Sequence, residues 1–423
     1  MNNLVPDGWY KTKIGDVLEI VNDRYEMKDE EHYPLLSVRR RNGGFFNREM
    51  LQGKNILTKT LSKAIPESFV ISKMQVVHGA CGIITEPFYN GFLSASYVSF
   101  LSKNNKTHLP YFNYLCHMPE MIKLFLLSSH GVHIEKMTFD IKDWLSREIV
   151  IPPLPEQKRI AKILTSVDEV IEKTQAQIDK LKDLKTGMMQ ELLTRGVGVD
   201  GKPHTEFKEI PKWTTGRIAD LKEIPSSWEL VNINDVAKLE SGHTPSRDKP
   251  EYWGGSFQWV SLHDTKQLHT PIINKTKLTI TQSGLDNSSA RLLPIGTIAF
   301  SRTASVGHCV MFGEKMATSQ DFANYVCGDK LSPRYVLQLF RWMQHVWSQL
   351  AEGSTHKTIY MPVFKKLHIL LPPLNEQVLI ADIAESIDKK ILMISDKLEA
   401  NKKLKKALMQ DLLTGKVRVK VDS

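Results

Sequence analysis

Two long stretches of the chain, one in each half, place their seam residues at steps of three and four. In the first stretch these positions are Ile160, Leu164, Val167, Ile171, Thr174, Ile178 and Leu181. In the second stretch they are Ile380, Ile383, Ile387, Ile391, Ile394 and Leu398. A period of 3.5 residues held over three or more heptads is typical of a coiled coil rather than of a core helix. We therefore predict two helices of about 40 residues, each about 60 Å long, packed on one another.

The same phrase opens both helices, IPPLPEQ at residues 151–157 and LPPLNEQ at 371–377. A residue before proline is driven out of the α region, so each phrase predicts a stiff, extended exit from the preceding domain. Pro155 suits a first helical turn, and Asn375 in the equivalent place is a good N-cap. Glu156 and Glu376 then lie where a negative charge favours the helix dipole.

The helices belong to an internal repeat. Residues 152–199 align with 372–419 without a gap, and 21 of the 48 positions are identical. A weaker likeness upstream pairs Trp9 with Trp228, and each half carries a helical stretch (111–127 and 334–350) followed by a glycine expected to cap it, Gly131 or Gly353. Tandem copies of this kind predict an antiparallel helix pair with pseudo-twofold symmetry.

Short β-rich runs broken by Gly and Pro precede each helix, which predicts an α+β fold with two mixed α/β globular domains. The predicted boundaries are 1–150 for the first domain, 151–199 for the first helical region, 200–224 for a linker, 225–370 for the second domain and 371–423 for the second helical region. The two domains share little sequence between these anchors, so the scaffold is repeated while its content differs.

Charge suggests a nucleic-acid partner without deciding it. The net charge is +9 and the pI about 9.1, but no segment is a cationic tail. Lys402, Lys403, Lys405 and Lys406 are expected on a solvated helix face, with phosphate binding as the alternative. Asn401 stands where the first helix has Leu181, either pinning the register or lying at a frayed seam edge.

The sequence carries no membrane or export signal that we recognise. No apolar run approaches the roughly 20 residues needed to span a bilayer, and MNNLVPDGWYKTK is not a signal peptide. The four cysteines form no C-x-x-C pair, so we expect reduced thiols in a cytoplasmic protein without a metal site.

Catalytic motifs are missing from the sequence. GVGVDG at residues 196–201 fits a dinucleotide pattern but follows a helix, so we interpret it as a helix stop. We find no Walker A loop, H-E-x-x-H, G-x-S-x-G or N/D-P-P-Y/F. The set favours a binding protein with no catalytic residue of its own.

Two kinds of stretch are candidates for DNA contact. The first is the basic run Arg39, Arg40, Arg41 and Asn42 before two glycines, since Arg and Asn pair with guanine and adenine edges. The second kind mixes hydroxyls with arginines, and its members are Thr244, Ser246, Arg247, Arg302 and Thr303. An ordinary polar surface loop is the alternative for each, and Trp253 and Trp259 are expected to anchor loops rather than to stack on bases.

With these motifs in place, the chain resembles the specificity subunits of type I restriction–modification systems. The resemblance spans essentially the whole length and rests on PPLPEQ and PPLNEQ, on the helix ends MMQELLTRGVGV and LMQDLLTGKVRV, and on HTEFKEIPKW…EIPSSWELVNINDV. SGHTPSRDKPEYWGG, ARLLPIGTIAF and ATSQDFANYV look like one common class of target recognition domain.

The resemblance implies that each globular domain reads one half of a bipartite site in double-stranded DNA. The helices would space the domains and dock two adenine-specific DNA methyltransferase subunits, and restriction (translocase–endonuclease) subunits would join them. We place that docking at Glu156, Gln157, Glu376 and Gln377. S-adenosylmethionine, Mg and ATP would bind to the partner subunits, so no cofactor is expected on this chain.

Three rival interpretations stay open at this point. The chain could be a nuclease or methyltransferase with unrecognised motifs, an adaptor that carries two protein-binding modules on a coiled coil, or an inactive or phase-variable member of the same family.

Overall fold

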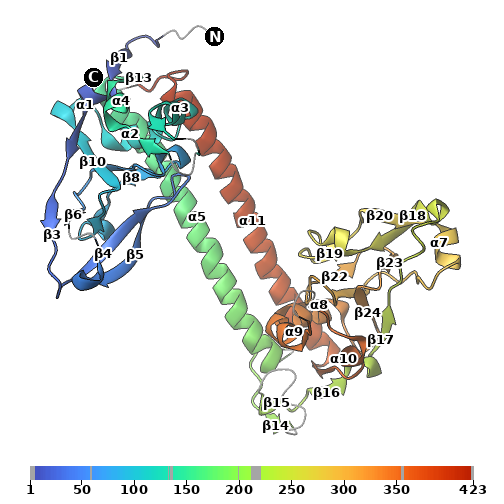
Figure 1. Cartoon of the computed structure of the whole chain (residues 1–423). Helices are drawn as coiled ribbons and strands as arrows, with labels where there is room; N and C mark the ends of the chain where they lie inside the picture. The colour runs from blue at the N-terminus through green and yellow to red at the C-terminus, as the bar shows by residue number, and fades with distance from the viewer. Residues whose placement is uncertain are drawn as a thin grey trace. The chain divides into compact units, whose positions relative to one another are not determined.

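The computed structural model describes residues 5–57, 60–131, 133, 137–198, 200–210, 221–353 and 357–420. The chain forms two compact units: unit 1 comprises Met1–Ala176 with Ser395–Ser423, and unit 2 comprises Gln177–Ile394. Each unit contains one globular domain together with a part of both long helices, which are green and red in Figure 1. The α+β class predicted from the sequence is confirmed.

The two long helices are α5 (Leu154–Thr194, 41 residues) and α11 (Leu374–Leu413, 40 residues), as predicted. Pro155 lies in the first turn of α5 as expected, but α11 begins ahead of the expected N-cap Asn375, because the Gln377 N–H donates to the carbonyl of Pro373 as the Gln157 N–H does to that of Pro153. Asn375 therefore lies inside the first turn, where its Oδ1 accepts the N–H of Glu376. At its other end α5 stops at Gly196, whose φ of +73° is the left-handed conformation of a helix C-cap.

Within each unit α5 and α11 run antiparallel. In unit 1, Ile160 and Leu164 of α5 share a core with Leu412 and Leu413 near the end of α11. In unit 2, Met189, Leu192 and Leu193 near the end of α5 share a core with Ile380 and Ala384 near the start of α11. The predicted coiled-coil seam is thus apolar where each globular domain packs on it.

Two ion pairs fix the register of the helices. Lys405 Nζ lies 2.6 Å from Asp168 Oδ1 in unit 1, and Lys185 Nζ lies 2.6 Å from Asp388 Oδ1 in unit 2. Asp388 and Lys405 each lie 220 positions after their counterparts, Asp168 and Lys185, so the repeat builds the same pair twice. Lys405 is therefore not on a solvated face as expected, because it is largely buried against Asp168.

The Asn401 amide does not pin the register. Its Nδ2 is buried without a hydrogen-bond partner among the described residues. The duplicated ion pairs, which are only partly exposed to solvent, take that role.

The globular domain of unit 1 is built on two larger sheets, of four and five strands among the described residues. The first has the order β2-β10-β7-β8: β2 (Leu18–Val21), β10 (Tyr97–Ser102), β7 (Phe69–Ser72) and β8 (Cys81–Ile83). The second has the order β3-β6-β9-β4-β5: β3 (Arg24–Glu26), β6 (Thr60–Lys63), β9 (Phe92–Leu93), β4 (His32–Val38) and β5 (Phe45–Gln52). The first sheet carries the main core, where Trp144 is fully buried among Phe100, Phe112 and Phe125.

Four short helices contribute side chains to this core, which also contains Ile160 and Leu164 of α5. They are α1 (Ile14–Val17), α2 (Leu109–Leu115), α3 (Pro119–Leu127) and α4 (Ile141–Ser146), with the strand pair β11 (Ser129–His130) and β12 (Thr138–Phe139) between the last two. The stretch expected as one helix over 111–127 is thus two helices, since Pro119 starts α3. Gly131, with a φ of +151°, lies beyond β11 and does not cap the helix.

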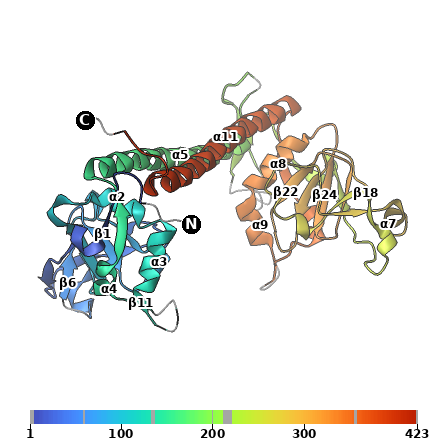
Figure 2. The same cartoon turned by 90° about the horizontal axis from the view of Figure 1, so that it is seen from above.

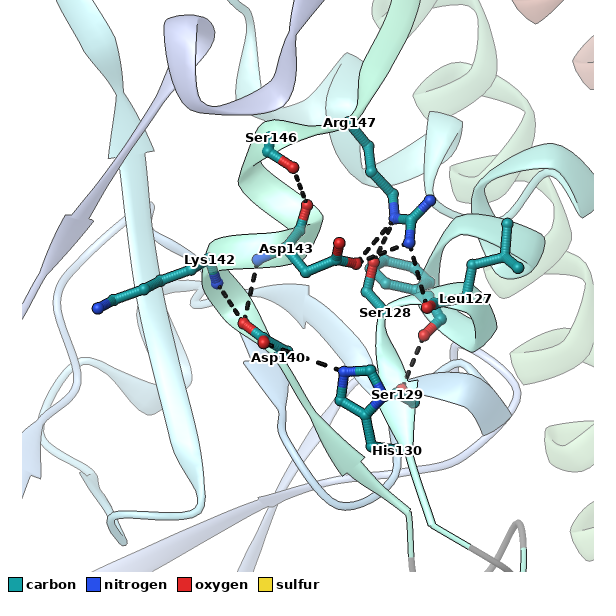
Figure 3. A network of polar contacts seen from close by, with 10 residues as sticks. Leu127, Ser128, Ser129, His130, Asp140, Lys142, Asp143, Ser146 and Arg147 are labelled. Carbon is teal, nitrogen blue, oxygen red and sulfur yellow. Dashed lines mark hydrogen bonds and ion pairs between the residues drawn. The ribbon is translucent and has the colours of Figure 1, made fainter.

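A polar network fastens the start of α4 and the end of α3 together (Figure 3). Asp140 caps α4 by accepting the N–H groups of Lys142 (2.9 Å) and Asp143 (3.0 Å). Arg147 Nε donates to Ser128 Oγ (2.6 Å), while its Nη2 donates to Asp143 Oδ2 (2.7 Å) and to the Leu127 carbonyl (3.1 Å). Hydrogen bonding to Ser128 and then to Arg147 holds the pKa of Asp143 below its ordinary value. The network positions the strand that leads into α5.

The globular domain of unit 2 is also built on two larger sheets, of five and three strands among the described residues. The first has the order β17-β24-β21-β22-β19: β17 (Ala237–Ser241), β24 (Phe322–Cys327), β21 (Ile298–Ser301), β22 (Cys309–Phe312) and β19 (Ile272–Ile273). The second has the order β20-β18-β23: β20 (Leu278–Ile280), β18 (Trp253–Val260) and β23 (Met316–Thr318). A short helix, α7 (Gln282–Asp286), follows β20.

In Figure 2, α8 (Pro333–Trp342) and α9 (Gln344–Leu350) lie against the first of these sheets, and α10 (Met361–Lys365) completes its cover. The break at Met343 divides the stretch expected as one helix over 334–350. Gly353, with a φ of +103°, lies beyond the end of α9 at Leu350.

Each globular domain joins its long helix through the same kind of strand pair. β1 (Tyr10–Lys13) is antiparallel to β13 (Glu148–Ile151), which runs into α5. β16 (Glu229–Asn232) is antiparallel to β25 (His368–Leu371), which runs into α11. A further pair, β14 (Phe207–Glu209) with β15 (Glu223–Pro225), lies between α5 and the second domain. Trp9 and Trp228, matched in the sequence, are buried beside these joints.

Candidate nucleic-acid interface

In the second domain the loop 242–247 leaves β17 and is fixed by two tryptophans. Trp259 Nε1 donates to the carbonyl of His243, and Trp253 Nε1 donates to that of Ser246, both at 3.0 Å. The two rings meet edge to face with centroids 5.0 Å apart. The expectation that these tryptophans anchor loops is confirmed.

The loop after β21 carries Arg302 and Thr303 and meets a turn formed by Ser319, Gln320 and Asp321. The Arg302 N–H donates to the Asp321 carbonyl and its Nε to the Gln320 carbonyl, both at 2.9 Å. Thr303 Oγ1 donates to Asp321 Oδ1 at 2.9 Å. Asp321 therefore holds both the backbone and the side chain of this loop.

The same turn also holds the loop after β17. The Thr244 hydroxyl donates to Gln320 Oε1, and the His243 N–H donates to the Thr318 carbonyl at 2.9 Å. A Cβ on Gly242 would lie 2.0 Å from the Ser319 carbonyl oxygen, so only glycine permits this close approach. The stretches 242–247 and 302–303, which were selected separately from the sequence, thus lie on one edge of the domain. Residues Ser319–Asp321 connect them.

This edge of the second domain has the chemistry that DNA requires. Ser246, Arg247 and Gln320 are exposed, while Thr244, Arg302 and Thr303 are half-buried. Among the described residues the Arg247 guanidinium has no hydrogen bond or ion pair. Guanidinium groups and hydroxyls suit phosphates, and the amide of Gln320 has the donor and acceptor geometry that pairs with adenine.

In the first domain the basic run is the tip of the hairpin between β4 and β5. Arg41 and Asn42 both have a φ of +56°, which is the two-residue left-handed turn that suits a tight hairpin. The Arg41 N–H donates to the His78 carbonyl (2.7 Å) and the Asn42 N–H to the Gly79 carbonyl (2.9 Å). The tip is therefore docked on the loop between β7 and β8.

The three arginines of this tip are exposed, and Asn42 is not. The Arg39 guanidinium lies 4.4 Å from the centroid of the Phe46 ring, a cation–π contact that orients it. Asn42 Oδ1 would lie 2.8 Å from a Cβ on Gly79, so this amide faces the domain. Arg39, Arg40 and Arg41 remain candidates for DNA contact, while the Asn42 amide is poorly placed to reach a base.

Three side chains, two thiols and an imidazole, have pKa values that are shifted by packing. Burial raises the pKa of Cys309 to about 11 and that of Cys327 to about 12, so neither thiol is an activated nucleophile. Burial, followed by the charge of Lys405, lowers the pKa of His117 to about 4. Among the described residues no group of His, Cys, Asp and Glu could hold a metal ion.

Comparison with known proteins decides the family. The profile of the Type I restriction modification DNA specificity domain matches this chain twice, at residues 6–183 and 225–402. The chain belongs to this family of type I specificity subunits.

Curated relatives agree with this assignment. The chain is similar to the MjaVIII specificity subunit of Methanocaldococcus jannaschii, at 26% identity over 98% of this chain and 94% of the relative. It is also similar to the HindI specificity subunit of Haemophilus influenzae, at 22% identity over 96% and 97%.

Solved structures show the same fold. A chain from a type I R-M system aligns with a TM-score of 0.58 at 13% identity, covering 98% of this chain and all of that one. The S subunit of a type I system from M. genitalium aligns with a TM-score of 0.55 at 12% identity, covering 96% of each chain.

One prediction made from the sequence of this specificity subunit, the site at which partner subunits dock, has to be corrected. Glu156, Gln157, Glu376 and Gln377 were expected to dock partner subunits, but their exposed fractions are only 0–3%. Gln157 Oε1 accepts the His108 N–H (2.9 Å) and Gln377 Oε1 accepts the Ser332 N–H (2.8 Å). These side chains therefore hold the long helices on the globular domains, and a partner cannot reach them.

The glutamates beside them bind the segments that close each unit. Glu156 accepts two hydrogen bonds from Arg418, at 2.8 Å each. Glu376 accepts the Val197 N–H (3.0 Å) and Trp228 Nε1 (2.9 Å). The segment that follows the end of each long helix thus returns to the glutamate at the start of the other helix, which explains why the E-Q pair appears twice.

Sequence reasoning missed Ser319, Gln320 and Asp321 as part of the interface. They had been quoted only as part of the resemblance, inside ATSQDFANYV. A run of hydroxyl, amide and carboxylate groups between two β-rich segments was the available signal.

In the described part of the chain no helix is long and apolar enough to cross a membrane.

Proposed function

We propose that each globular domain of this specificity subunit contacts one half of a bipartite site in double-stranded DNA. The observation that carries the proposal is the edge of the second domain, where two separately selected loops converge on the turn 319–321. The exposed arginine tip of the first domain is its counterpart. Two different loop surfaces on a repeated scaffold fit a site with two unlike halves.

The two long helices set the gap between the half-sites in this proposal. A strand pair joins each long helix to its globular domain, and an ion pair fixes the register of the two helices within each unit. A helix pair of this kind is stiff along its axis, so its length acts as a ruler.

Two copies of an adenine-specific DNA methyltransferase are the proposed partners of the helices. The repeat places Leu184 and Leu404 at equivalent positions, and they are 52% and 51% exposed. Large apolar side chains exposed at two equivalent places fit one kind of partner bound twice. Restriction subunits would join this complex in the cytoplasm, and S-adenosylmethionine, Mg and ATP would belong to the partners.

The test is to co-express the chain with its methyltransferase subunit and to map methylated adenines across the host genome. We expect a single bipartite motif, with adenines on opposite strands and a gap of fixed length. No new methylation in cells that contain the assembled complex would contradict the proposal.

A further inference from the structure

The first sheets of the two globular domains share four strands in the same register. β10 pairs with β7 so that Tyr97 lies opposite Ser72, as β24 pairs with β21 so that Phe322 lies opposite Ser301. The match extends across both sheets, and the further equivalent pairs are Leu18–Ser102 with Ala237–Cys327, and Ile71–Cys81 with Phe300–Cys309. The four strands β2-β10-β7-β8 are therefore the counterparts of β17-β24-β21-β22, residue by residue.

This register identifies the counterpart of Arg302 in the first domain. Lys73 follows Ser72 as Arg302 follows Ser301. The Lys73 N–H donates to the Ser96 carbonyl at 2.8 Å, and the Arg302 N–H donates to the Asp321 carbonyl at 2.9 Å. A cationic residue thus stands at the same point of the same sheet edge in both domains, although the sequences around it differ.

The turn that holds Lys73 is the counterpart of the turn 319–321. Ser94, Ala95 and Ser96 precede β10 as Ser319, Gln320 and Asp321 precede β24. Each turn is entered from a short strand, β9 or β23, that pairs in parallel with the longer strand β4 or β18. The two turns therefore have the same surroundings as well as the same position.

The arginine tip of the first domain lies on the loop that Lys73 begins. His78 and Gly79, whose carbonyls accept the N–H groups of Arg41 and Asn42, belong to the loop between β7 and β8. The Lys73 side chain is half-buried, its neighbour Met74 is 43% exposed, and Ala95 and Ser96 are exposed. The tip, Lys73 and the turn 94–96 thus make one accessible edge.

We propose that Lys73 is a DNA contact of the first domain, on an edge formed by the tip 39–42, the loop 73–80 and the turn 94–96. The proposal rests on the proposed function, since it names where the first half-site lies. An ammonium group is a point charge that suits a phosphate rather than a base edge. Lys73 would therefore position the DNA, and the arginine tip beside it would supply the contacts that depend on sequence.

The test measures binding of the assembled complex to a duplex that carries the mapped bipartite site, over a series of salt concentrations. Lys73→Ala should weaken binding roughly tenfold, the worth of one charge-assisted hydrogen bond. The slope of log K against log salt should fall in magnitude by about 0.9. The ranking of half-site variants should stay as it is, and Lys73→Arg should restore most of the affinity.

Lys106 supplies the matched control, because it is exposed and lies beyond the opposite end of β10, a strand about 20 Å long. Lys106→Ala should bind like the unchanged chain. If Lys73→Ala also binds with unchanged affinity and slope, the inference is wrong while the proposed function stands. If the unchanged complex itself shows no preference for the mapped site, the proposed function fails.

Discussion

At the scale of single residues, Asp321 has the most specific task in the interface. Its carboxylate accepts hydrogen bonds from Thr303 and Ser319, at 2.9 Å each, and its carbonyl accepts the N–H of Arg302. Asp321 does not need to touch DNA to matter, because it positions the residues that would. It is a positioning residue for the second half-site.

Substitutions of Asp321 distinguish its positioning role from the loss of a negative charge. Asp321→Ala removes the carboxylate that holds the Thr303 and Ser319 hydroxyls and should weaken binding of the second half-site about tenfold or more, while Asp321→Asn keeps one oxygen acceptor and should lose less. The measurement is binding of duplexes with either half-site altered. Asp329→Ala removes an exposed carboxylate beyond the other end of β24 and serves as control. An Asp321→Ala complex that binds as Asp329→Ala does would contradict the assignment.

Sequence alone reached some of these residues and not others, for a physical reason. The arginines beside glycines could be selected from the sequence as candidates for DNA contact, because an exposed guanidinium group suits DNA wherever it lies in the fold. Lys73 has no such feature in the sequence, since its position depends on the pairing of β7 with β10, whose partners lie 25 to 31 positions apart. The inward turn of Asn42 likewise follows from a contact with Gly79 that the sequence does not show.

At the scale of elements, the two long helices were predictable from the sequence, whereas the role of the Glu-Gln pair at the start of each helix was not. The 3.5-residue period predicted the two helices, because a coiled-coil seam repeats its apolar positions at that spacing, and the tandem repeat predicted their antiparallel packing. The E-Q pair suggested a docking surface, but a polar pair at a helix start can equally satisfy buried backbone groups. Burial decides between these readings, and it places Glu156 and Gln157 inside.

The helix pair that sets the gap between the half-sites can be lengthened without changing the heptad pattern of its apolar seam. Seven residues inserted after Ala176 and seven after Asp396, its equivalent, keep the heptad phase and add about 10 Å, or about three base pairs. The gap of the methylated motif should grow by that amount with both half-sites unchanged. The same seven residues inserted in the segment 200–210 should leave the gap as it is. A gap that ignores the helix insertions would show that the helices are not the ruler.

At the scale of the whole molecule, both halves of the chain share one scaffold, while the second sheets built on it differ. The strand pairs, the helix ion pairs and the four shared strands recur in both halves. The second sheets differ, with five strands in the first domain and three in the second. Sequence comparison of the halves finds the helices, but it misses the shared strands because their register is kept by pairing rather than by residue identity.

This division implies that each globular domain recognises its half-site independently of the other. The most direct measurement is a methylation map made with residues 225–370 replaced by the second domain of another family member whose motif is known. One half of the bipartite motif should change to that of the donor, while the other half and the gap stay the same. A map in which both halves change together, or in which neither changes although methylation persists, would contradict the account.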